Sequence, residues 1–313
     1  MKVLTHNDIV KLNVSPITCV EWVEESFSLK DECILPHKIS IPLSGNIFFN
    51  TMPCVMPMIN AIGAKIVSRF PCRKPSIDGQ IVLYSLETGK LEFLMDANWI
   101  TAARTGAVAA SSVRKFAKTS FENISFIGLG NTARSTTACL LALFPDRPIK
   151  IRLMAYKNQT ELFMQRFSEA KNLTFEVVSN VEALVEGADV LVSCVTAAVS
   201  LFAQDKAFKE GVLVVPVHTR GFQNCDLFFD KVFADDTAHV SGFLNFNKFK
   251  TFAEYSSVLK GVAPGRESEK ERILCYNIGV AIHDIFFAKK IASISANQGM
   301  EFSLQSPNEK FWF

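Results

Sequence analysis

The sequence GLGNTA, which begins at Gly128, contains the residues with the clearest chemical meaning in this chain. It follows a short apolar run and precedes a predicted helix over residues 131–143. Gly128 permits a tight turn, Gly130 lets the backbone approach a pyrophosphate, and Ala133 allows the helix to pack against the strand. The free N–H groups at the start of the helix would then bind the phosphates. The motif alone is weak evidence, because a strand, turn and helix that bind no ligand can share its spacing.

The segments after this motif alternate between predicted strands and predicted helices. The predicted strands are runs rich in apolar and β-branched residues at residues 149–156, 174–179, 188–195 and 211–217. Such runs are typical of a parallel sheet that helices cover on both faces. We therefore expect an α/β fold in which residues 105–277 form a Rossmann-type domain that binds a nicotinamide dinucleotide.

The choice between NAD and NADP depends on the end of the second predicted strand. An Asp or Glu there would accept a hydrogen bond from the ribose 2′-hydroxyl of NAD. Residues 155–158 read Ala-Tyr-Lys-Asn and contain no acid. Lys157 could contact the 2′-phosphate of NADP, or it could be a solvated surface lysine. The expected cofactor is therefore NAD or NADP.

Composition limits the class of protein. The chain has 313 residues, of which 49% are hydrophobic and 20% charged, so it is long enough for two globular domains. Its formal net charge of +2, with no basic stripe, argues against a nucleic-acid partner. No run of 18 apolar residues is free of charges and the N-terminus has no signal-peptide core. We therefore expect no membrane partner and a cytoplasmic location.

The spacing of cysteines and histidines bears on metal binding and on redox state. The eight cysteines include no CxxC pair, and the five histidines include no HExxH or HxH pattern. This scatter favours reduced thiols over a disulfide framework or a zinc site. We expect no metal site.

The part of the chain before the glycine motif is predicted to be rich in strands and to end in a long helix. Strands are expected at residues 34–43, 46–53, 63–70, 80–86 and 91–95, and an Ala-rich helix at residues 97–118. Lys65 lies within one of these strands, where it either points to solvent or is a cation among apolar residues. Arg104 lies among alanines and threonines of the helix, which offer it little cover unless an anion meets it.

Six segments, in their order and spacing, resemble the ornithine cyclodeaminase/μ-crystallin family. They are GAKIVSRFP, the hairpin around ETGK, ITAARTGAVAA, GLGNTA, GADVLVSCV and NIGVAIHDI, and they extend over nearly the whole chain. The resemblance implies a homodimer with two domains per subunit. Residues 1–104 and 278–313 would form the smaller α+β substrate and dimerisation domain, and residues 105–277 the Rossmann domain. The apolar tail that ends in Phe311, Trp312 and Phe313 would suit a partner surface.

The resemblance also implies roles for individual residues. Lys65 would hold the substrate carboxylate and move protons, and Arg104 would lie between that carboxylate and the nicotinamide. The full substrate-binding set is Lys38, Lys65, Arg104, Ile278 and Gly279. Together with Lys157, the cofactor-binding set is Ser76, Arg104, Gly128, Gly130, Asn131, Thr132 and Thr196, with Thr132 where a Gln is common.

Three positions depart from the family pattern. Lys38 stands in place of an arginine, His218 in place of a glycine, and Arg220 in place of the catalytic aspartate after the fifth strand of the Rossmann domain. A guanidinium carries the wrong sign to hold a substrate amine and does not deprotonate, so ornithine cyclisation is disfavoured. If Lys38 and Arg220 face one pocket together with Lys65 and Arg104, the natural ligand should carry more than one negative group.

Hydride transfer survives the exchange of aspartate for arginine better than ring closure does. It requires a dinucleotide held against a carbon and a proton donor, which Lys65 or His218 could supply. An unperturbed histidine titrates near neutral pH. The catalytic candidates are thus Lys65, His218 and Arg220.

These observations favour an NAD(P)-dependent oxidoreductase that acts on a dicarboxylic or otherwise polyanionic amino or imino acid. The expected reaction is imine reduction, or the reverse oxidation of a secondary amine as in opine-type chemistry. The first alternative is a redox-neutral cyclodeaminase that uses Asp226, Asp235 or Asp236 as its acid. The second is a μ-crystallin-like protein that binds dinucleotide without catalysis.

Overall fold

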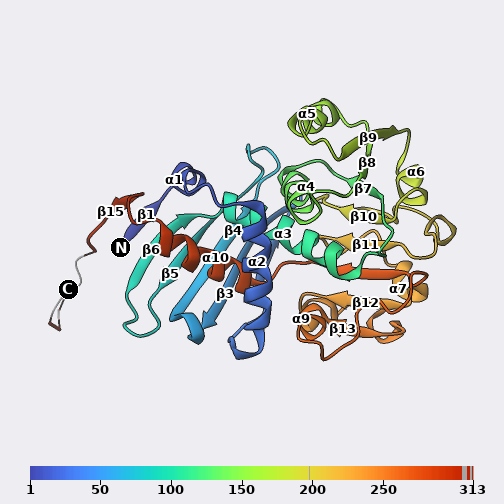
Figure 1. Ribbon diagram of the computed structural model, residues 1–313. Coiled ribbons are helices and arrows are strands. Elements are labelled where there is room, and N and C mark those ends of the chain that lie inside the picture. Colours follow the sequence, from blue (N-terminus) through green and yellow to red (C-terminus); the bar gives the residue numbers. More distant parts are fainter. Residues whose placement is uncertain (197, 305–308, 311, 313) are drawn as a thin grey trace. The chain divides into compact units, whose positions relative to one another are not determined.

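The computed structural model describes residues 1–196, 198–304, 309–310 and 312, and it divides the chain into two compact units (Figure 1). Unit 1 comprises Met1–Val14, Asp31–Thr101 and Ala281–Phe313, and unit 2 comprises Ser15–Lys30 and Ala102–Val280. The expected boundaries after residues 104 and 277 stay a prediction, but residues 15–30 group with unit 2. Of the tail aromatics, Phe311 and Phe313 lie outside the described residues, and Trp312 is 98% exposed.

Unit 1 is built around a mostly antiparallel sheet. Within the described residues its seven strands have the order β15-β1-β6-β5-β4-β3-β2, and β1 and β6 are the parallel pair. The strands are β1 (Lys2–Leu4), β2 (Ile39–Leu43), β3 (Ile47–Met56), β4 (Ala61–Arg69), β5 (Ile77–Tyr84), β6 (Leu91–Asp96) and β15 (Met300–Glu301). The unit also contains α1 (His6–Lys11) and α10 (Ala281–Ile294), and α10 packs against β3, β4 and β5. Because side chains alternate along a strand, every second residue of β4 faces this helix.

Unit 2 is a doubly wound α/β unit. Its described strands form an eight-stranded parallel sheet of order β13-β12-β14-β11-β10-β7-β8-β9. The chain passes from β7 outward to β8 and β9 and then returns to place β10 on the other side of β7. This reversal is the switch point at which Rossmann folds bind dinucleotides. The predicted α/β fold class, with a second and smaller domain, is confirmed.

The elements of unit 2 have the following bounds. The strands are β7 (Asn123–Ile127), β8 (Ile149–Met154), β9 (Leu173–Val178), β10 (Val190–Ser193), β11 (Leu213–Pro216), β12 (Lys231–Ala234), β13 (Phe252–Glu254) and β14 (Ile273–Tyr276). The helices are α2 (Pro16–Ser28), α4 (Asn131–Leu143), α5 (Gln159–Arg166), α6 (Val181–Glu186), α7 (Cys225–Phe228), α8 (Thr237–Val240) and α9 (Tyr255–Leu259). Helix α3 (Asn98–Phe116) begins in unit 1 and continues in unit 2. Short 3-10 helices occur at Lys30–Glu32, Pro57–Ile59, Asp205–Ala207 and Phe246–Lys248.

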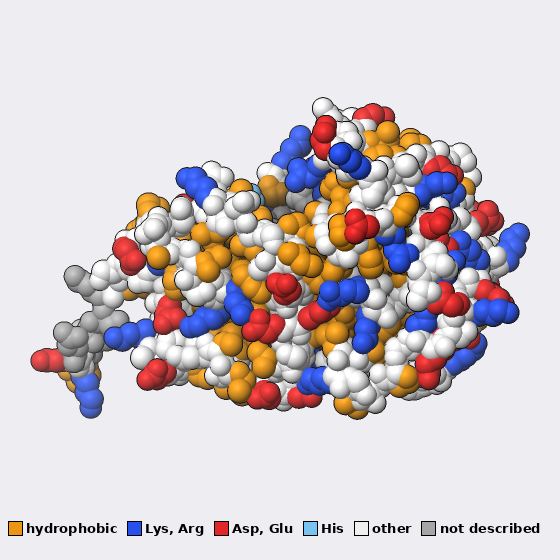
Figure 2. Space-filling model, viewed as in Figure 1, with side chains coloured by type: hydrophobic (Ala, Val, Ile, Leu, Met, Phe, Trp, Pro, Cys, Tyr) orange, Lys and Arg blue, Asp and Glu red, His pale blue; other side chains and the backbone are white. Residues whose placement is uncertain are grey.

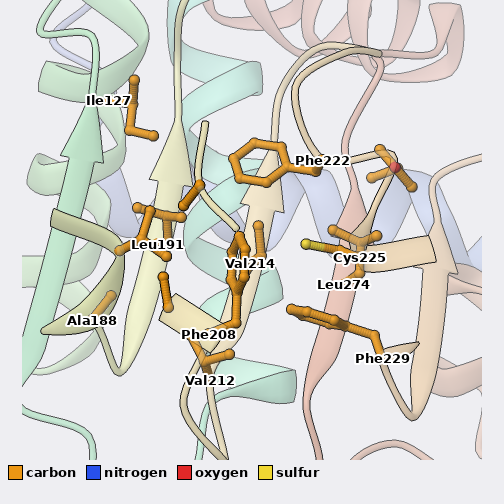
Figure 3. Close-up of a cluster of buried hydrophobic side chains, with 14 of the residues drawn as sticks. Ile127, Ala188, Leu191, Phe208, Val212, Val214, Phe222, Cys225, Phe229 and Leu274 are labelled. Carbon is orange, nitrogen blue, oxygen red and sulfur yellow. The ribbon is translucent and has the colours of Figure 1, made fainter. Parts of the chain in front are cut away.

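A buried hydrophobic cluster supports the sheet of unit 2 (Figure 3). Strand residues such as Leu191 and Val214 meet aromatic side chains from the connecting segments, among them Phe208 and Phe229. The ring centroids of Phe208 and Phe229 are 5.7 Å apart in an edge-to-face arrangement. Such pairs add about 0.5–1.5 kcal/mol beyond the burial of their area. This packing accounts for some of the 27 phenylalanines of the chain.

Helix α2 belongs to unit 2 because its polar contacts are made there. Glu24 forms a salt bridge with Arg114 of α3. At the end of α2, Lys30 lies 2.8 Å from Asp236 and 2.5 Å from Glu254, and it is 8% exposed. These long-range ion pairs have no local sequence signal, so the sequence alone predicts residues 15–30 in the N-terminal domain.

The surface of unit 2 shows no block of one charge on the face drawn in Figure 2, where acidic and basic side chains are interspersed. None of the described helices is long and apolar enough to cross a membrane. Among the described residues, no group of three or more His, Cys, Asp or Glu side chains could hold a metal ion.

Candidate functional site

The carboxyl ends of parallel strands meet at one edge of the unit 2 sheet, and most of the predicted site residues of that unit lie there. Open α/β sheets bind their ligands at this edge. The residues that follow β7, β10, β11, β12 and β14 are Gly128, Thr196, His218, Asp235 and Gly279. Four of these were predicted to contact cofactor or substrate or to act in catalysis, and Asp235 was named as an alternative acid.

The glycine turn has the form that a pyrophosphate site requires. Gly128 has φ +90°, and a Cβ there would lie 3.1 Å from the carbonyl carbon of Cys194, so a side chain would strain the turn. Gly130 precedes α4, and a Cβ there would have no atom of the described chain within 4 Å. Asn131 and Thr132 begin α4, and Ala133 is fully buried behind them. The turn therefore leaves open space in front of the helix N-terminus, which fits a dinucleotide.

The segment after β8 contains the residues that would face the ribose. Lys157 is exposed with φ +52°, and its Nζ lies 5.4 Å from the centroid of the exposed Tyr156 ring. The hydroxyl of Thr160 donates to Met154 O and accepts from Tyr156 N, which ties this turn to α5. No acid lies at the end of β8. A contact between Lys157 and the 2′-phosphate of NADP stays a prediction.

Arg134 is a candidate that the sequence analysis missed. It lies one residue beyond the glycine motif, in the first turn of α4. Its Nε is buried and has no hydrogen-bond partner among the described residues. A buried guanidinium nitrogen without an acceptor is unusual, so an anion near the start of α4 would satisfy it. Its position directly after the motif was the available signal.

His218 lies at the end of β11 in an apolar setting. Its Nε2 is 2.6 Å from Ser193 Oγ, and its ring packs against Phe202 and Phe222 with centroid distances of 6.0 and 6.2 Å. Burial lowers the pKa of His218 to about 4. The ring is therefore neutral at pH 7, whereas an unperturbed histidine titrates near neutral pH. This environment favours Lys65 over His218 as the proton donor.

Arg220 is exposed in the loop that follows β11. The next residue, Gly221, has φ +99° and accepts a hydrogen bond from Phe202 N at 3.1 Å, which holds the loop against residues 198–203. No salt bridge joins Arg220 to an acid among the residues that the structure describes. The nearby Asp226 is 1% exposed and accepts a hydrogen bond from the Tyr276 hydroxyl at 2.8 Å. Arg220 therefore makes no salt bridge to Asp226, the acid six residues further along the chain.

Arg104 and Gly279, which were predicted separately, lie together in unit 2. Arg104 is 5% exposed on α3, and a Cβ at Gly279 would lie 2.7 Å from its Nη1. Gly279 has φ +95°, and its N–H donates to Oδ2 of the fully buried Asp235. Oδ1 of Asp235 lies 3.6 Å from Nδ1 of His239. The half-buried Ile278 precedes this contact. The carboxylate of Asp235 thus fixes the backbone on which the Arg104 guanidinium rests.

The acids proposed for a cyclodeaminase are engaged in other contacts. Asp236 pairs with Lys30, and Asp235 accepts from Gly279 N. Burial raises the pKa of Asp226 to about 6. Of the three, Asp235 is the acid beside a predicted substrate-binding residue.

Lys38, Lys65 and Ser76 belong to unit 1. Lys65 is 1% exposed on β4, and its Nζ lies 2.7 Å from Asp284 Oδ2, so the solvent-facing alternative is excluded. Lys38 is half-buried immediately before β2. Ser76 is half-buried before β5, and its carbonyl accepts from Phe70 N at 2.8 Å. Because these residues and the two arginines belong to different units, the convergence of four cations on one anion stays a prediction.

Comparison with known proteins decides the family. Residues 1–298 match the ornithine cyclodeaminase/mu-crystallin family. The chain belongs to this family. The resemblance stated from the sequence is thus confirmed. The family assignment also explains why the six motifs are spread over both units.

Individual relatives are distant but extend over most of the chain. A delta(1)-pyrroline-2-carboxylate reductase of Bacillus cereus is 25% identical over 295 residues, which cover 86% of this chain and 89% of that protein. An N-((2S)-2-amino-2-carboxyethyl)-L-glutamate dehydrogenase of Staphylococcus aureus is 26% identical over 225 residues, or 66% and 65% of the two chains. The solved structure of the Thermococcus litoralis delta(1)-pyrroline-2-carboxylate reductase superposes with a TM-score of 0.85 at 23% identity, covering 96% and 100%.

Replacement of Gly130 by alanine tests whether the glycine turn holds a dinucleotide. The backbone at Gly130 has φ −75°, and a Cβ there meets no atom within 4 Å, so Gly130→Ala should fold as the wild type does. The methyl group should occupy the approach of the phosphates and weaken NADH and NADPH binding by roughly tenfold or more, about 1.4 kcal/mol. Fluorescence titration of both cofactors measures this. Gly242→Ala, also without neighbours within 4 Å, should bind as the wild type does. Equal cofactor binding by the wild type, Gly130→Ala and Gly242→Ala would show that the glycine turn does not bind the dinucleotide.

The ionisation of His218 can be measured without a substrate. We expect its ring ¹H–¹³C NMR signal, assigned by its loss in His218→Gln, to titrate near pH 4, because burial penalises the charged ring. The unfolded chain takes up this proton more readily, so His218 should lower the free energy of unfolding as pH falls from about 6.5 toward 4. A midpoint at pH 6 or above would return His218 to the list of proton donors.

Proposed function

We propose that this chain is an NAD(P)-dependent oxidoreductase that transfers hydride at the carbon–nitrogen centre of an anionic amino or imino acid. Its family membership supports this proposal. Two relatives also support it, the pyrroline-2-carboxylate reductase and the glutamate-derivative dehydrogenase, because each is named for a substrate with a carbon–nitrogen bond. The Thermococcus litoralis structure was solved with NADH and L-proline, which supports the cofactor. The open space in front of Gly130 fits the same ligand.

The observation that carries the choice of reaction is the exposed Arg220 without a salt bridge among the described residues. At the position where the family resemblance expects a catalytic aspartate, this chain has a cation that does not deprotonate. Arg220 cannot receive a proton from a substrate amine, but it can bind a carboxylate through two parallel hydrogen bonds. We therefore propose a substrate with a second carboxylate. The N-(2-amino-2-carboxyethyl)-L-glutamate named for the Staphylococcus aureus relative has several carboxylates.

The proposed reaction reduces a C=N bond with one hydride and one proton. When bound, NAD(P)H would supply the hydride and become NAD(P)⁺. The residues of the chain supply the remaining functions. Arg104, seated on Gly279, would bind the carboxylate next to the reacting carbon. The proton for the nitrogen would come from a general acid, the role that the family resemblance gives to Lys65. His218 stays neutral and packs against Phe202 and Phe222 beside the loop that follows β11.

Oxidation of NADH and NADPH by the purified protein tests the proposal. Substrates are Δ1-pyrroline-2-carboxylate, as a monocarboxylic imine, and 2-oxoglutarate paired in turn with amino acids. We expect Arg220→Gln to raise KM for the diacid by roughly 10- to 100-fold and to change KM for the monoacid far less, because a hydrogen bond to a charged group contributes about 1.5–3 kcal/mol. Arg166→Gln, which removes an exposed cation of α5, is the matched control.

Other outcomes of this assay point to the alternatives. Equal effects of Arg220→Gln on both substrate classes would remove the dicarboxylic assignment. Cofactor binding without any turnover, followed by formation of proline and ammonia from ornithine, would identify a cyclodeaminase. Cofactor binding with neither activity would identify a non-catalytic binding protein.

We also propose that the protein is a homodimer of the cytoplasm. Strand β2 is an edge strand of the unit 1 sheet, and its Ile39, Ile41 and Leu43 are 61%, 51% and 54% exposed. An apolar edge strand invites pairing with a second copy. All eight cysteines are free thiols, which supports a reducing compartment.

Light scattering tests the dimer. The wild type should have twice the mass of one chain, and Ile39→Lys with Ile41→Lys should give the monomer, because two ammonium groups would be buried in the interface. Leu162→Lys, which alters an exposed leucine of α5, should leave the mass unchanged. A monomeric wild type, or a doubled mass in the double variant, would contradict an interface at β2.

A further inference from the structure

A buried ion pair in unit 1 gives Lys65 a defined chemical state. Lys65 Nζ lies 2.7 Å from Asp284 Oδ2, and the two side chains are 1% and 0% exposed. We infer that Asp284 is a positioning residue that holds Lys65 in place and keeps its amine protonated. This inference rests on the function proposed above, in which Lys65 donates a proton to the substrate.

The surroundings of Lys65 are apolar. On the inner face of the sheet it lies opposite Met52 of β3 and Ile81 of β5, which are 6% and 0% exposed. Such neighbours cannot replace the water around an ammonium group, so an isolated lysine here would favour its neutral form. A carboxylate in contact reverses that preference, because it supplies the opposite charge at short range.

Helix α10 brings the carboxylate to this point. Gly63 shares the inner face of β4 with Lys65, and a Cβ at Gly63 would lie 2.9 Å from Ile285 Cδ1. Without that atom, the helix can approach the strand closely. Asp284 precedes Ile285 and lies in the first turn of α10, where the helix dipole favours a negative charge. The carboxylate is thus stabilised by the helix as well as by Lys65.

The other titratable groups near the pair do not replace Asp284. On α10 the neighbouring residue is the fully buried His283, and on β3 it is Cys54, which is 1% exposed. A hydrogen bond with Cys33, burial and the charge of Asp284 all raise the pKa of Cys54, so it remains a neutral thiol. Of these groups, Asp284 is the one that can carry a negative charge at neutral pH.

The ion pair with Asp284 favours Lys65 as a proton donor over Lys65 as a proton acceptor. In imine reduction, a proton moves from Nζ to the nitrogen while the carbon accepts hydride from NAD(P)H, and Nζ then regains a proton from water. A lysine that rests as ammonium is ready for this step at neutral pH. It is a poor base for the reverse oxidation, which should therefore require alkaline pH.

Lysine labelled with ¹³C at Cε reports the charge of each amine without any substrate. The Lys65 signal, assigned by its loss in Lys65→Met, should stay at its ammonium position up to about pH 9.5 in the wild type. In Asp284→Asn it should titrate at least about 2 pH units lower than in the wild type, because the buried amine loses its counter-charge. Asp284→Glu, which restores the charge, should move the titration back toward the wild type. The same Lys65 titration in Asp284→Asn and the wild type would overturn the inference.

The pH profile of kcat/KM for imine reduction is a second readout. In Asp284→Asn its alkaline limb should move to lower pH, whereas general damage to the fold would lower activity at every pH alike. If the wild type turns over no substrate, the proposed function fails, but the NMR titration still tests the pair. If Asp284→Asn does not fold, the double variant Lys65→Met with Asp284→Asn should fold, because no buried charge remains. A double variant that is no more stable than Asp284→Asn would show that the two residues are not coupled.

Discussion

The parallel hydrogen-bonding of the unit 2 sheet is the constraint on which the arrangement of the candidate site depends. A parallel strand must be followed by a crossover, so every strand of the sheet points the same way and every following loop emerges at the same edge. A sheet covered on both faces needs strands made of apolar residues. Strand β11 (Leu213–Pro216) is an example, because all its residues are buried. The loops after β7, β11 and β14 are then free to carry the glycine turn, His218 and Gly279.

Several buried cations in the described part of the chain are paired with acids. Lys30 contacts Asp236 and Glu254, and Arg152 contacts Glu176 at 3.1 Å. These pairs hold α2 and the strands β8 and β9 in place. Arg220 differs, because it is exposed and has no salt bridge among the described residues. A cation at the carboxyl edge without an acid is one whose partner can come from solution.

The parts of the structure that the sequence predicts well are those with local causes. The glycine turn and the strands of unit 2 follow from steric preferences over a few residues. The predicted strand at residues 34–43 is shorter in the structure, where β2 begins at Ile39. Lys65 and Asp284 are 219 residues apart in the chain, and no pattern within either segment predicts that they form a pair. The depressed pKa of His218 has the same origin, since its apolar neighbours Phe202 and Phe222 come from the packed structure.

The charges at the carboxyl edge of unit 2 support the proposal that arginine at position 220 suits an anionic substrate. His218 is neutral, and the carboxylate of Asp235 is occupied by the Gly279 N–H. Arg104 and Arg220 outnumber the Asp235 carboxylate and so give these residues a net positive charge, which a cationic ornithine side chain would not balance. An aspartate in place of Arg220 would lower that charge by two. The edge then suits a substrate amine with aspartate, and a second substrate carboxylate with arginine.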